Sequence, residues 1–422
     1  MSALLRRIEA NAVPSLTREA VDADALAQAG QIIGAVRERG EAALREYGER
    51  FGDIAPGATL VYSRDALHKA LSQLDDETVL LLRRTAERIR VFAEAQKNAL
   101  AELTLAIESG HAGHAIAPVE RAACYAPGGR YPLVSSVLMT AIPARVAGVD
   151  QVWVASPKPL PEILAAAAVA GADNLLAVGG AQAIAALAYG AGPVPACDVI
   201  VGPGNRFVTA AKKLVVGKVA IDLPAGPSEL VVLADAEADP ALIAADLLAQ
   251  AEHDPDALPV LVSLDEALIE KVERELARQL ADLPTADTAR RALTNGFAVV
   301  AQNTEQAIAI CDRLAPEHLQ IMTANAEDFS PRLRHYGALF IGAGSAEVLG
   351  DYGAGPNHAL PTGGAARFAG GLSVFHFLRV RTWLHLAEPS PDLLRDAAAL
   401  ARLEGLRGHE KAALIRRRKS KS

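Results

Sequence analysis

The sequence is poor in several features that would mark particular classes of protein. Aromatic residues make up only 4% of its 422 positions, and its three cysteines, Cys124, Cys197 and Cys311, are widely spaced without a CxxC pair. An odd number of scattered cysteines does not suit a secreted disulfide scaffold and is typical of a reducing compartment. The formal net charge of -8 argues against nucleic acid as the main partner, because neutralising phosphates requires a basic face.

The sequence also lacks recognisable targeting and membrane segments. Its start, MSALLRRIEANAV, has no apolar region followed by a small-residue cleavage site, and therefore predicts no secretory signal. The uncharged stretch 174–197 is long, but Gly179, Gly180, Pro193 and Pro195 interrupt it. We interpret this stretch as a strand, a turn and a helix. The sequence thus predicts a cytoplasmic protein with no membrane segment.

Length and periodicity predict an α/β protein. At 422 residues the chain exceeds the size at which one hydrophobic core stops growing, so we expect two main domains with terminal extensions. Helical periodicity dominates residues 23–107, including an amphipathic run at 76–101, and returns at 391–415. Between them, strand-like segments alternate with Ala-rich helical ones, which indicates βαβ units and parallel sheets. The expected strands are 151–155, 175–178, 198–201, 229–234, 258–263, 297–301, 319–323 and 338–341.

The most informative residues are four pairs in which a histidine accompanies a carboxylate or an amide. Each pair lies in or beside a Gly/Pro-rich turn or a predicted helix end, where side chains from distant segments can converge on one cleft. Together they supply metal ligands, a proton acceptor and a group that activates water, which indicates a metalloenzyme. The pairs are Gln250 with His253, Glu317 with His318, Asp351 with His358, and Glu404 with His409.

Two of these pairs are candidate metal ligands. Gln250 and His253 stand three residues apart at the end of a predicted helix, 240–251, so both side chains can face one point. Taken alone, a histidine at a helix end is more often a capping or surface residue. Asp351 and His358 offer the hard and borderline donors that zinc accepts, although Asp followed by Tyr-Gly equally suits an ordinary turn.

Glu317 and His318 are candidates for acid–base chemistry. They follow Pro316, which disfavours helix at Ala315, and they precede a predicted strand, so we expect the pair at the mouth of that strand. A histidine titrates near neutral pH and can accept a proton, while a glutamate can orient a water. The alternative interpretation is a salt-bridged glutamate beside a surface histidine.

A strand, a glycine turn and a helix are predicted for the segment VIVGPGNRFVTAAKK, a geometry that places backbone N–H groups against phosphate. A nucleotide is therefore a candidate ligand, with Tyr125 and Gln182 on loops that face the same expected cleft. The segment has neither the GxGxxG spacing nor the P-loop pattern, and the chain contains no HExxH. Gly342-Ala343-Gly344 has Glu347 where a third glycine is required, and we interpret it as a turn.

Eight segments, spread over nearly the whole chain, match one family in order and approximate spacing. They are YAPGGRYPLVSSVLMTAIPARVAGV, GGAQAIAAL, GPGNRFVTAAKK, DLPAGPSEL, QAEH, APEHLQ, GDYGAGPNHALPTGG and EGLRGHE. With these segments the chain resembles bacterial L-histidinol dehydrogenase. The resemblance implies that Glu317 and His318 are catalytic acid/base residues. The zinc ligands that it implies are Gln250, His253, Asp351 and His409.

The resemblance also implies which residues contact the substrate and the cofactor. Substrate contacts are expected from Ser228, His358 and Glu404, together with the zinc ligands and the catalytic pair. The family forms an intertwined homodimer, which implies that Glu404 and His409 reach the active site of the partner subunit. The residues expected to contact NAD are Tyr125, Gln182 and Asn205.

The fold implied by the resemblance is α/β, with two incomplete Rossmann-like parallel-sheet domains and helical N- and C-terminal extensions. Incomplete Rossmann-like sheets fit the missing GxGxxG. The division that we expect is an N-terminal extension at 1–20, a discontinuous first domain at 21–124 and 230–372, an inserted second domain at 125–229, and a C-terminal helical extension at 373–422 that reaches the partner subunit.

The activity implied by the resemblance is the NAD-dependent, zinc-requiring, four-electron oxidation of L-histidinol to L-histidine through L-histidinal, at the end of histidine biosynthesis. We expect His318 to accept the alcohol proton and Glu317 to activate the water that hydrates the aldehyde. Zinc is expected mainly to orient the substrate, although manganese or cobalt also suits such ligands. Three alternatives stay open: a related enzyme that oxidises another small alcohol, a zinc hydrolase, and a binding protein without catalytic activity.

Overall fold

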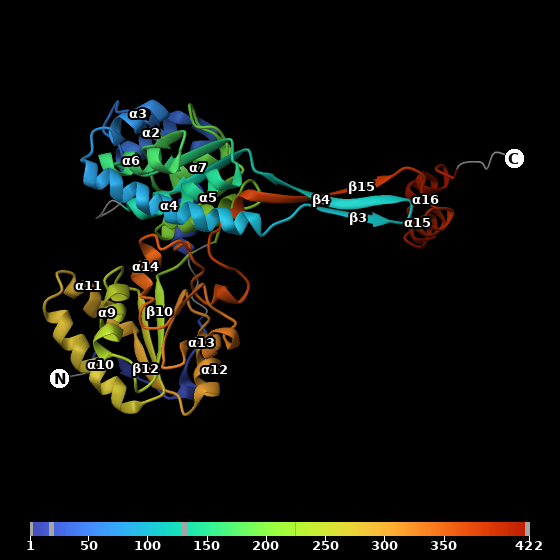
Figure 1. The fold of residues 1–422 in the computed structure, drawn as a ribbon. Coiled ribbons are helices and arrows are strands. Elements are labelled where there is room, and N and C mark those ends of the chain that lie inside the picture. Colours follow the sequence, from blue (N-terminus) through green and yellow to red (C-terminus); the bar gives the residue numbers. More distant parts are fainter. Residues whose placement is uncertain (1–2, 17–20, 129–132, 224, 418–422) are drawn as a thin grey trace. The chain divides into compact units, whose positions relative to one another are not determined.

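The computed structural model describes residues 3–16, 21–128, 133–223 and 225–417. The chain divides into two compact units, Met1–Lys97 with Val119–Phe377 and Asn98–Pro118 with Leu378–Ser422. The first unit contains two lobes, each built on a six-stranded sheet covered by helices (Figure 1). In the part of the chain that the structure describes, no helix is long and apolar enough to cross a membrane.

The first lobe has the strand order β2-β7-β6-β5-β8-β9, in which only the edge strand β2 is antiparallel to its neighbour. Its Ala-rich helices α6 and α7 are buried almost all round, because small side chains let helices pack closely on a sheet. The strands are β2 (Val61–Ser63), β5 (Arg121–Tyr125), β6 (Gln151–Ala155), β7 (Asn174–Leu176), β8 (Val199–Val201) and β9 (Ala220–Ile221). The helices are α1 (Ala23–Arg39), α2 (Glu41–Arg50), α3 (Arg64–Leu71), α4 (Asp76–Asn98), α5 (Val134–Ala147), α6 (Pro161–Ala170), α7 (Gly180–Tyr189) and α8 (Arg206–Val215).

The second lobe has the strand order β1-β12-β11-β10-β13-β14, and all of these strands are parallel. Its strands are β1 (Arg6–Arg7), β10 (Glu229–Ala234), β11 (Leu258–Ser263), β12 (Phe297–Val300), β13 (His318–Met322) and β14 (Ala338–Ile341). Its helices are α9 (Pro240–Ala251), α10 (Glu266–Ala281), α11 (Ala286–Asn295), α12 (Thr304–Leu314), α13 (Ala326–Phe329) and α14 (Glu347–Asp351). Short 3-10 helices occur at Ala10–Ala12, Ser330–Arg332, Ala365–Arg367 and Val374–Phe377.

Two hydrophobic cores lie on the two faces of the second-lobe sheet. Alternate residues of β10 point to opposite faces, as the period of a strand requires. Leu230 and Val232 join α9, α10 and α11 in one core, whereas Val231 and Leu233 join α12 and α13 in the other. Figure 1 shows the two groups of helices on opposite sides of this sheet. Strands buried on both faces explain the continuous apolar runs in the sequence.

Apart from the edge strands β2 and β1, both sheets place the first of their five remaining strands in the middle. The orders β7-β6-β5-β8-β9 and β12-β11-β10-β13-β14 each follow the 3-2-1-4-5 pattern of a doubly wound sheet that lacks a sixth strand. The order changes direction between β5 and β8 in the first lobe and between β10 and β13 in the second. The prediction of an α/β protein with parallel sheets is therefore confirmed.

The second unit is a three-stranded antiparallel ribbon followed by two helices. The ribbon has the order β15-β4-β3, with β3 (Leu103–Ile107), β4 (Gly110–Pro118) and β15 (Leu378–Leu386). The helices are α15 (Pro391–Leu403) and α16 (Arg407–Leu414). A Cβ on Gly113 would lie 2.6 Å from the ring of Trp383, so the indole covers a strand position that has no side chain of its own.

The expected domain division differs from the structure in three places. Residues 61–63 and 121–124 belong to the first-lobe sheet rather than to the lobe of residues 230–372, because β2 pairs with β7 and β5 lies between β6 and β8. The N-terminus is not a separate extension, since Leu5 is fully buried and β1 pairs with β12. The C-terminal segment is not wholly helical, because β15 pairs with β4 along nine residues.

Candidate active site

A cavity of about 600 Å³ collects residues from both lobes of the first unit. One part of its lining is Pro127 and residues 202–205, which follow β5 and β8 at the carboxyl edge of the first-lobe sheet. Another part is Ser228, Glu317 and His318, which lie where β10 and β13 begin, at the amino edge of the second-lobe sheet. The cavity therefore combines the strand-order change of one lobe with acid–base residues of the other.

His318 stands at the centre of a buried cluster of carboxylates. Its Nδ1 donates a hydrogen bond to the backbone carbonyl of Glu229 at 3.0 Å. This bond leaves Nε2, which is buried without a hydrogen-bond partner and lies 3.8 Å from Asp351 Oδ1, as the nitrogen that can still accept a proton. Nδ1 also lies 3.6 Å from Glu317 Oε2. Burial lowers the pKa of this imidazole, but the surrounding carboxylates outweigh burial and raise the pKa to about 10.

Glu317 is a buried carboxyl group whose pKa lies near neutral pH. Its Oε2 accepts a hydrogen bond from the backbone N–H of Glu229 at 2.9 Å. Burial raises the pKa of Glu317 to about 7, against the opposing charge of His318. A carboxyl group with this pKa can both hold and release a proton at physiological pH, as general acid–base catalysis requires.

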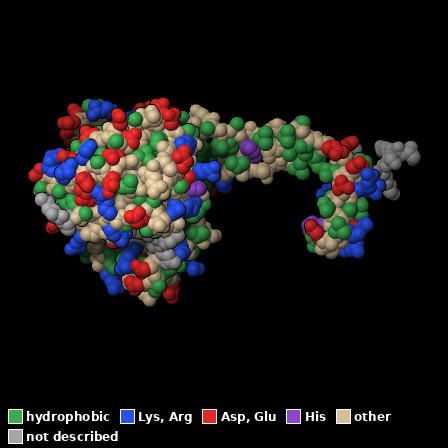
Figure 2. All heavy atoms as spheres, turned by 90° about the horizontal axis from the view of Figure 1, so that it is seen from below, with side chains coloured by type: hydrophobic (Ala, Val, Ile, Leu, Met, Phe, Trp, Pro, Cys, Tyr) green, Lys and Arg blue, Asp and Glu red, His purple; other side chains and the backbone are tan. Residues whose placement is uncertain are grey.

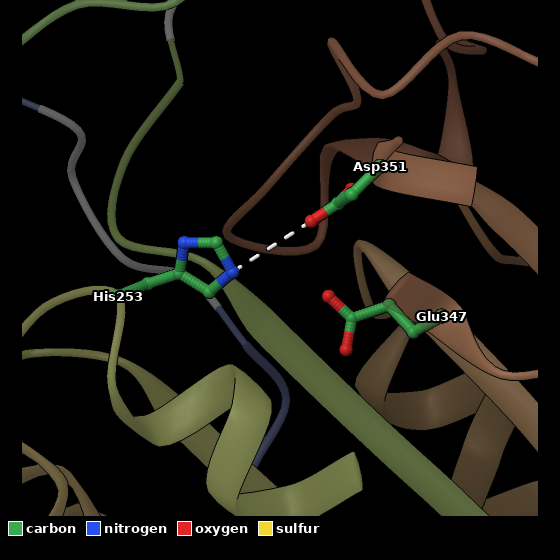
Figure 3. Close-up of side chains that lie close together, drawn as sticks. All are labelled: His253, Glu347 and Asp351. Atoms are coloured by element: carbon green, nitrogen blue, oxygen red, sulfur yellow. Dashed lines mark ion pairs between the residues drawn. The ribbon is translucent and has the colours of Figure 1, made fainter. Parts of the chain in front are cut away.

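His253, Glu347 and Asp351 form a candidate metal site, which Figure 3 shows in close-up. One ligand atom from each of them lies within 4.8 Å of the others, and His253 Nε2 is 3.6 Å from Asp351 Oδ2. His253 comes from the turn after α9, and the two carboxylates stand four residues apart on α14. Imidazole and carboxylate oxygen are donors that zinc and related divalent ions accept.

Gln250 adds a second observation in favour of a metal. Its side chain is fully buried, yet neither Oε1 nor Nε2 has a hydrogen-bond partner. An unsatisfied buried amide costs free energy, so such groups in a native protein call for a missing ligand or water. Gln250 lies in the last turn of α9 and precedes His253 by three residues, although it is not among the residues that line the cavity. The donor set thus fits a divalent cation with an amide oxygen among its ligands.

Glu347 is a site residue that the sequence analysis did not single out. It is 2% exposed, its Oε1 lies 3.8 Å from His318 Nδ1, and burial raises its pKa to about 8. Asp351 differs: burial opposes its ionisation, but the adjacent His318 more than compensates and lowers its pKa. The sequence signal for Glu347 was its spacing from Asp351, because residues four apart share one face of a helix.

His358 and Ser228, for which substrate contacts are a prediction, also line the cavity. His358 Nδ1 donates to the backbone carbonyl of Asp351 at 3.1 Å, and its Nε2 lies 3.5 Å from Ser136 Oγ. Burial lowers the pKa of His358, so this imidazole is neutral at physiological pH. A neutral ring held at Nδ1 is suited to a polar contact through Nε2.

The three residues predicted to contact NAD occupy different positions. Asn205 lines the cavity and caps α8, accepting hydrogen bonds from the N–H groups of Phe207 and Val208. Tyr125 and Gln182 are buried beyond the cavity lining. Tyr125 Oη accepts from the N–H of Gly180 at 3.1 Å. Gln182 Nε2 donates to Asp53 Oδ2 at 3.0 Å, and Asp53 is a neighbour that the sequence analysis missed.

Glu404 and His409 are not brought to this cavity by the first unit. Both belong to the second unit, where they are exposed, at the end of α15 and on α16. Their expected roles as substrate contact and metal ligand therefore stay predictions. The residues that do line the cavity together are Ser228, His253, Glu317, His318, Asp351, His358 and Asn205.

Doubly wound sheets, a buried acid–imidazole pair and a cluster suited to a metal define the class of protein as an α/β enzyme equipped for proton transfer. The sequence model of the family described as histidinol dehydrogenase matches residues 16–417. The chain belongs to the histidinol dehydrogenase family, and it is an oxidoreductase.

Similar proteins cover almost the whole chain. Histidinol dehydrogenase of Thermus thermophilus is 48% identical over 389 residues, which cover 92% of this chain and 93% of the relative. Histidinol dehydrogenase of Pseudomonas aeruginosa is 44% identical, with 91% of this chain and 89% of the relative covered. The crystal structure of histidinol dehydrogenase from Elizabethkingia anophelis superposes with a TM-score of 0.91 at 31% identity, covering 99% of this chain and 98% of that one.

Proposed function

We propose that this protein oxidises L-histidinol to L-histidine through L-histidinal, with NAD as oxidant and zinc as resident metal, in the last steps of histidine biosynthesis. The observation that carries the proposal is the buried Glu317–His318 pair facing one cavity with His253 and Asp351. Two successive oxidations at one carbon need a base for the alcohol and a second group for the water that hydrates the aldehyde. The pair supplies both.

His318 is the proposed base for the alcohol proton. The hydrogen bond from Nδ1 to the Glu229 carbonyl fixes the ring, so that Nε2 is the atom that accepts the proton. Glu317 is the proposed base for water, because its carboxylate lines the cavity beside His318 and its pKa is raised to about 7. NAD, when bound, accepts the hydride of each oxidation.

Gln250, His253 and Asp351 are the proposed zinc ligands within one chain, and His409 of the partner subunit is the proposed fourth. Zinc, when bound, orients the imidazole and amine of the substrate and adds positive charge beside His318, which favours the neutral form of that ring. Glu347 offers a further carboxylate beside this position, and a bound divalent cation would favour its charged form. His358 and Ser228, with Glu404 of the partner subunit, are proposed to contact the substrate.

The strand-order change between β5 and β8 supports the proposed NAD site. In doubly wound sheets, ligands bind beyond the carboxyl ends of the strands at this point. Residues 202–205 line the cavity there, and Asn205 caps the helix whose N-terminus favours phosphate. We place the pyrophosphate over this turn, with Tyr125 and Gln182 at the same edge of the sheet.

A homodimer with shared active sites is the second part of the proposal. The ribbon and helices of the second unit expose large apolar side chains that a lone chain would leave in water, among them Leu384 at 63%, Leu403 at 84% and Ile415 at 74%. Figure 2 shows hydrophobic side chains along this ribbon. Exposed apolar surface of this kind marks a protein interface, and a two-fold arrangement would bring Glu404 and His409 to a partner's site.

Reaction stoichiometry tests the proposed oxidation. The zinc-loaded protein is incubated with limiting L-histidinol and excess NAD, and reduced nicotinamide is measured by its absorbance. Two NADH per histidinol are expected, with L-histidine as the product identified by chromatography. One NADH per substrate with accumulation of an aldehyde would instead indicate a related alcohol dehydrogenase, and no NADH would refute the proposal.

Complementation tests the shared site. The variants Glu317→Gln and His409→Asn each lack one function, but a hybrid dimer would contain one site with both residues intact. Random mixing of inactive chains is expected to restore about a quarter of wild-type activity, because half of the dimers are hybrids and each has one complete site. Activity that stays at the level of the separate variants would contradict site sharing.

A further inference from the structure

A buried ion pair lies beside the turn that follows β8. Lys212 on α8 and Asp222 after β9 form a salt bridge, and their side chains are only 3% and 9% exposed. The groups are ten residues apart in sequence, and neither has a part in the proton transfers or in the proposed metal site. Their position is unusual for lysine and aspartate, which are almost never buried unless they are paired.

Both backbone polar groups of Gly202 are held by this pair. Lys212 Nζ donates to the carbonyl of Gly202 at 2.9 Å and to that of Leu223 at 3.2 Å. Asp222 Oδ2 accepts from the N–H of Gly202 at 2.7 Å. The ion pair therefore ties together the turn after β8 and the segment after β9, which both line the cavity.

The turn after β8 has no room for a side chain at Gly202 or Gly204. Gly202 has a φ of +114°, and a Cβ there would lie 2.0 Å from the carbonyl oxygen of Tyr125. A Cβ on Gly204 would lie 2.3 Å from Val208 Cγ1. The ends of β5 and β8 thus approach each other closely at the place where the strand order changes, and a small displacement of Gly202 would move the backbone N–H groups of Gly204 and Asn205, since Pro203 has none.

Stability alone does not account for an ion pair at this position. Removing two charges from water costs several kcal/mol per ion, and apolar replacements of a buried pair are often neutral or stabilising. What apolar side chains cannot do is accept from one backbone group and donate to another, and this pair does both at Gly202. The bonds position backbone rather than fill space.

We propose that Lys212 and Asp222 are positioning residues that hold the Gly202 turn in the conformation that binds the dinucleotide. The inference rests on the proposed use of NAD. The ion pair is expected to affect the affinity for NAD and not the proton transfers or metal binding. Neither side chain needs to touch the cofactor. Their effect passes through the Gly202 backbone to Gly204 and Asn205, which line the cavity.

The test compares two variants of the full-length, zinc-loaded protein. Lys212→Met removes both bonds to carbonyl groups and leaves Asp222 unpaired, so it is expected to weaken folding as well as NAD binding. Lys212→Met combined with Asp222→Asn removes the unpaired charge while Asn still offers an acceptor to Gly202. The measured quantities are the Kd for NAD by titration calorimetry, the KM for NAD and for histidinol, zinc content, and Tm.

A roughly 10- to 100-fold rise in the Kd and KM for NAD is expected in both variants, as small displacements of binding groups produce. The KM for histidinol and the zinc content are expected to stay within twofold of wild type. The double variant is expected to recover Tm but not NAD affinity. Recovery of NAD affinity together with Tm would mean that the pair acts only through stability, and would overturn the proposal.

The matched control is the Arg145–Asp173 ion pair of the same lobe. Its side chains are 20% and 22% exposed, and it lies at the opposite edge of the sheet, where Asp173 accepts from the N–H of Val152 at the start of β6. Arg145→Met with Asp173→Asn is expected to lower Tm and leave the Kd for NAD unchanged. An equal loss of NAD affinity in the control would refute a specific role for Lys212 and Asp222. Wild-type protein that binds no NAD would instead refute the proposed function, and this inference with it.

Discussion

Replacing Glu317 by glutamine separates the two oxidation steps. The substitution keeps the size of the side chain. In the wild-type structure the backbone N–H of Glu229 donates to Glu317 Oε2 at 2.9 Å, and the amide oxygen of glutamine can accept the same hydrogen bond. It removes the ability to take a proton from water. General bases contribute about 10²- to 10⁴-fold, so conversion of histidinal to histidine is expected to slow by that factor. Oxidation of histidinol is expected to slow by less than about tenfold, because His318 retains Nε2 for the alcohol proton.

The same substitution has a calculable effect on folding. Burial raises the pKa of Glu317 from 4.5 to about 7. The folded protein therefore binds a proton that the unfolded chain releases between these pH values, and wild-type stability falls as pH rises through this window. The full loss is about 3 kcal/mol above pH 7. Glutamine does not titrate, so the variant does not lose stability in this pH window. The substitution also removes the attraction between the Glu317 carboxylate and His318. At pH 8 the variant is therefore expected to be as stable as wild type or more stable.

Two measurements check this reasoning. Single-turnover experiments with histidinol and with histidinal separate the two steps, and urea unfolding at pH 4.5 and pH 8 gives the free energies of unfolding. Asp173→Asn is a suitable control, because that carboxylate lies outside the cavity. Acid formation from histidinal at the wild-type rate in Glu317→Gln would remove Glu317 from the mechanism. A large drop in stability at pH 8 would show that the carboxylate stabilises the fold, contrary to its raised pKa.

Three further substitutions probe other parts of the structure. His409→Asn is expected to lower zinc per subunit, measured by elemental analysis after dialysis, and an unchanged content with unchanged activity would exclude it as a ligand. Gln250→Leu is expected to abolish the rise of Tm with added zinc, while the metal-free protein gains about 1–3 kcal/mol, because an unpaired buried amide is gone; a zinc-dependent Tm equal to wild type would contradict this. Leu5→Ala is expected to cost about 2–5 kcal/mol in urea unfolding, since Leu5 fills the second-lobe core, and a cost below 1 kcal/mol would mean that the N-terminal strand packs loosely.

Local signals in the sequence were sufficient for much of the second lobe. The bounds of β10 and of α9 agree with the prediction residue for residue. An uninterrupted apolar run identifies a strand buried on both faces, and Asp239 followed by Pro240 marks the helix start through a side-chain cap and a fixed φ. Such elements are determined by neighbours in the chain, which a sequence displays directly.

Sheet membership and the ribbon were not predictable in the same way. Strand β5 lies between β6 and β8, a pairing between segments far apart in sequence, and nothing local assigns it to one lobe. In β15, LRVRTWLHL, apolar and polar residues mostly alternate, which is a strand signal. We nevertheless expected a helical extension. The residues of β15 pack into no hydrophobic core of a single chain, so burial gave no support to a strand at this position.

The candidate site divides along the same line. Motif resemblance placed Glu317, His318 and His253 in one cavity, and the structure brings them together. Glu347 was not identified as a site residue because it lies on a helix of only five residues, too short to show periodicity. Asp53 was missed because it is far from Gln182 in the sequence, and a hydrogen bond between such distant residues leaves no spacing pattern in the sequence.

The two tryptophans of the chain are distributed one to each compact unit. Trp153 lies in β6 and is 4% exposed, whereas Trp383 lies over Gly113 on the ribbon and is 37% exposed. Replacing Trp153 by phenylalanine would leave a protein whose tryptophan emission comes from the ribbon alone. A dilution series of that protein, followed by emission wavelength, would report directly on whether the indole leaves water as chains associate.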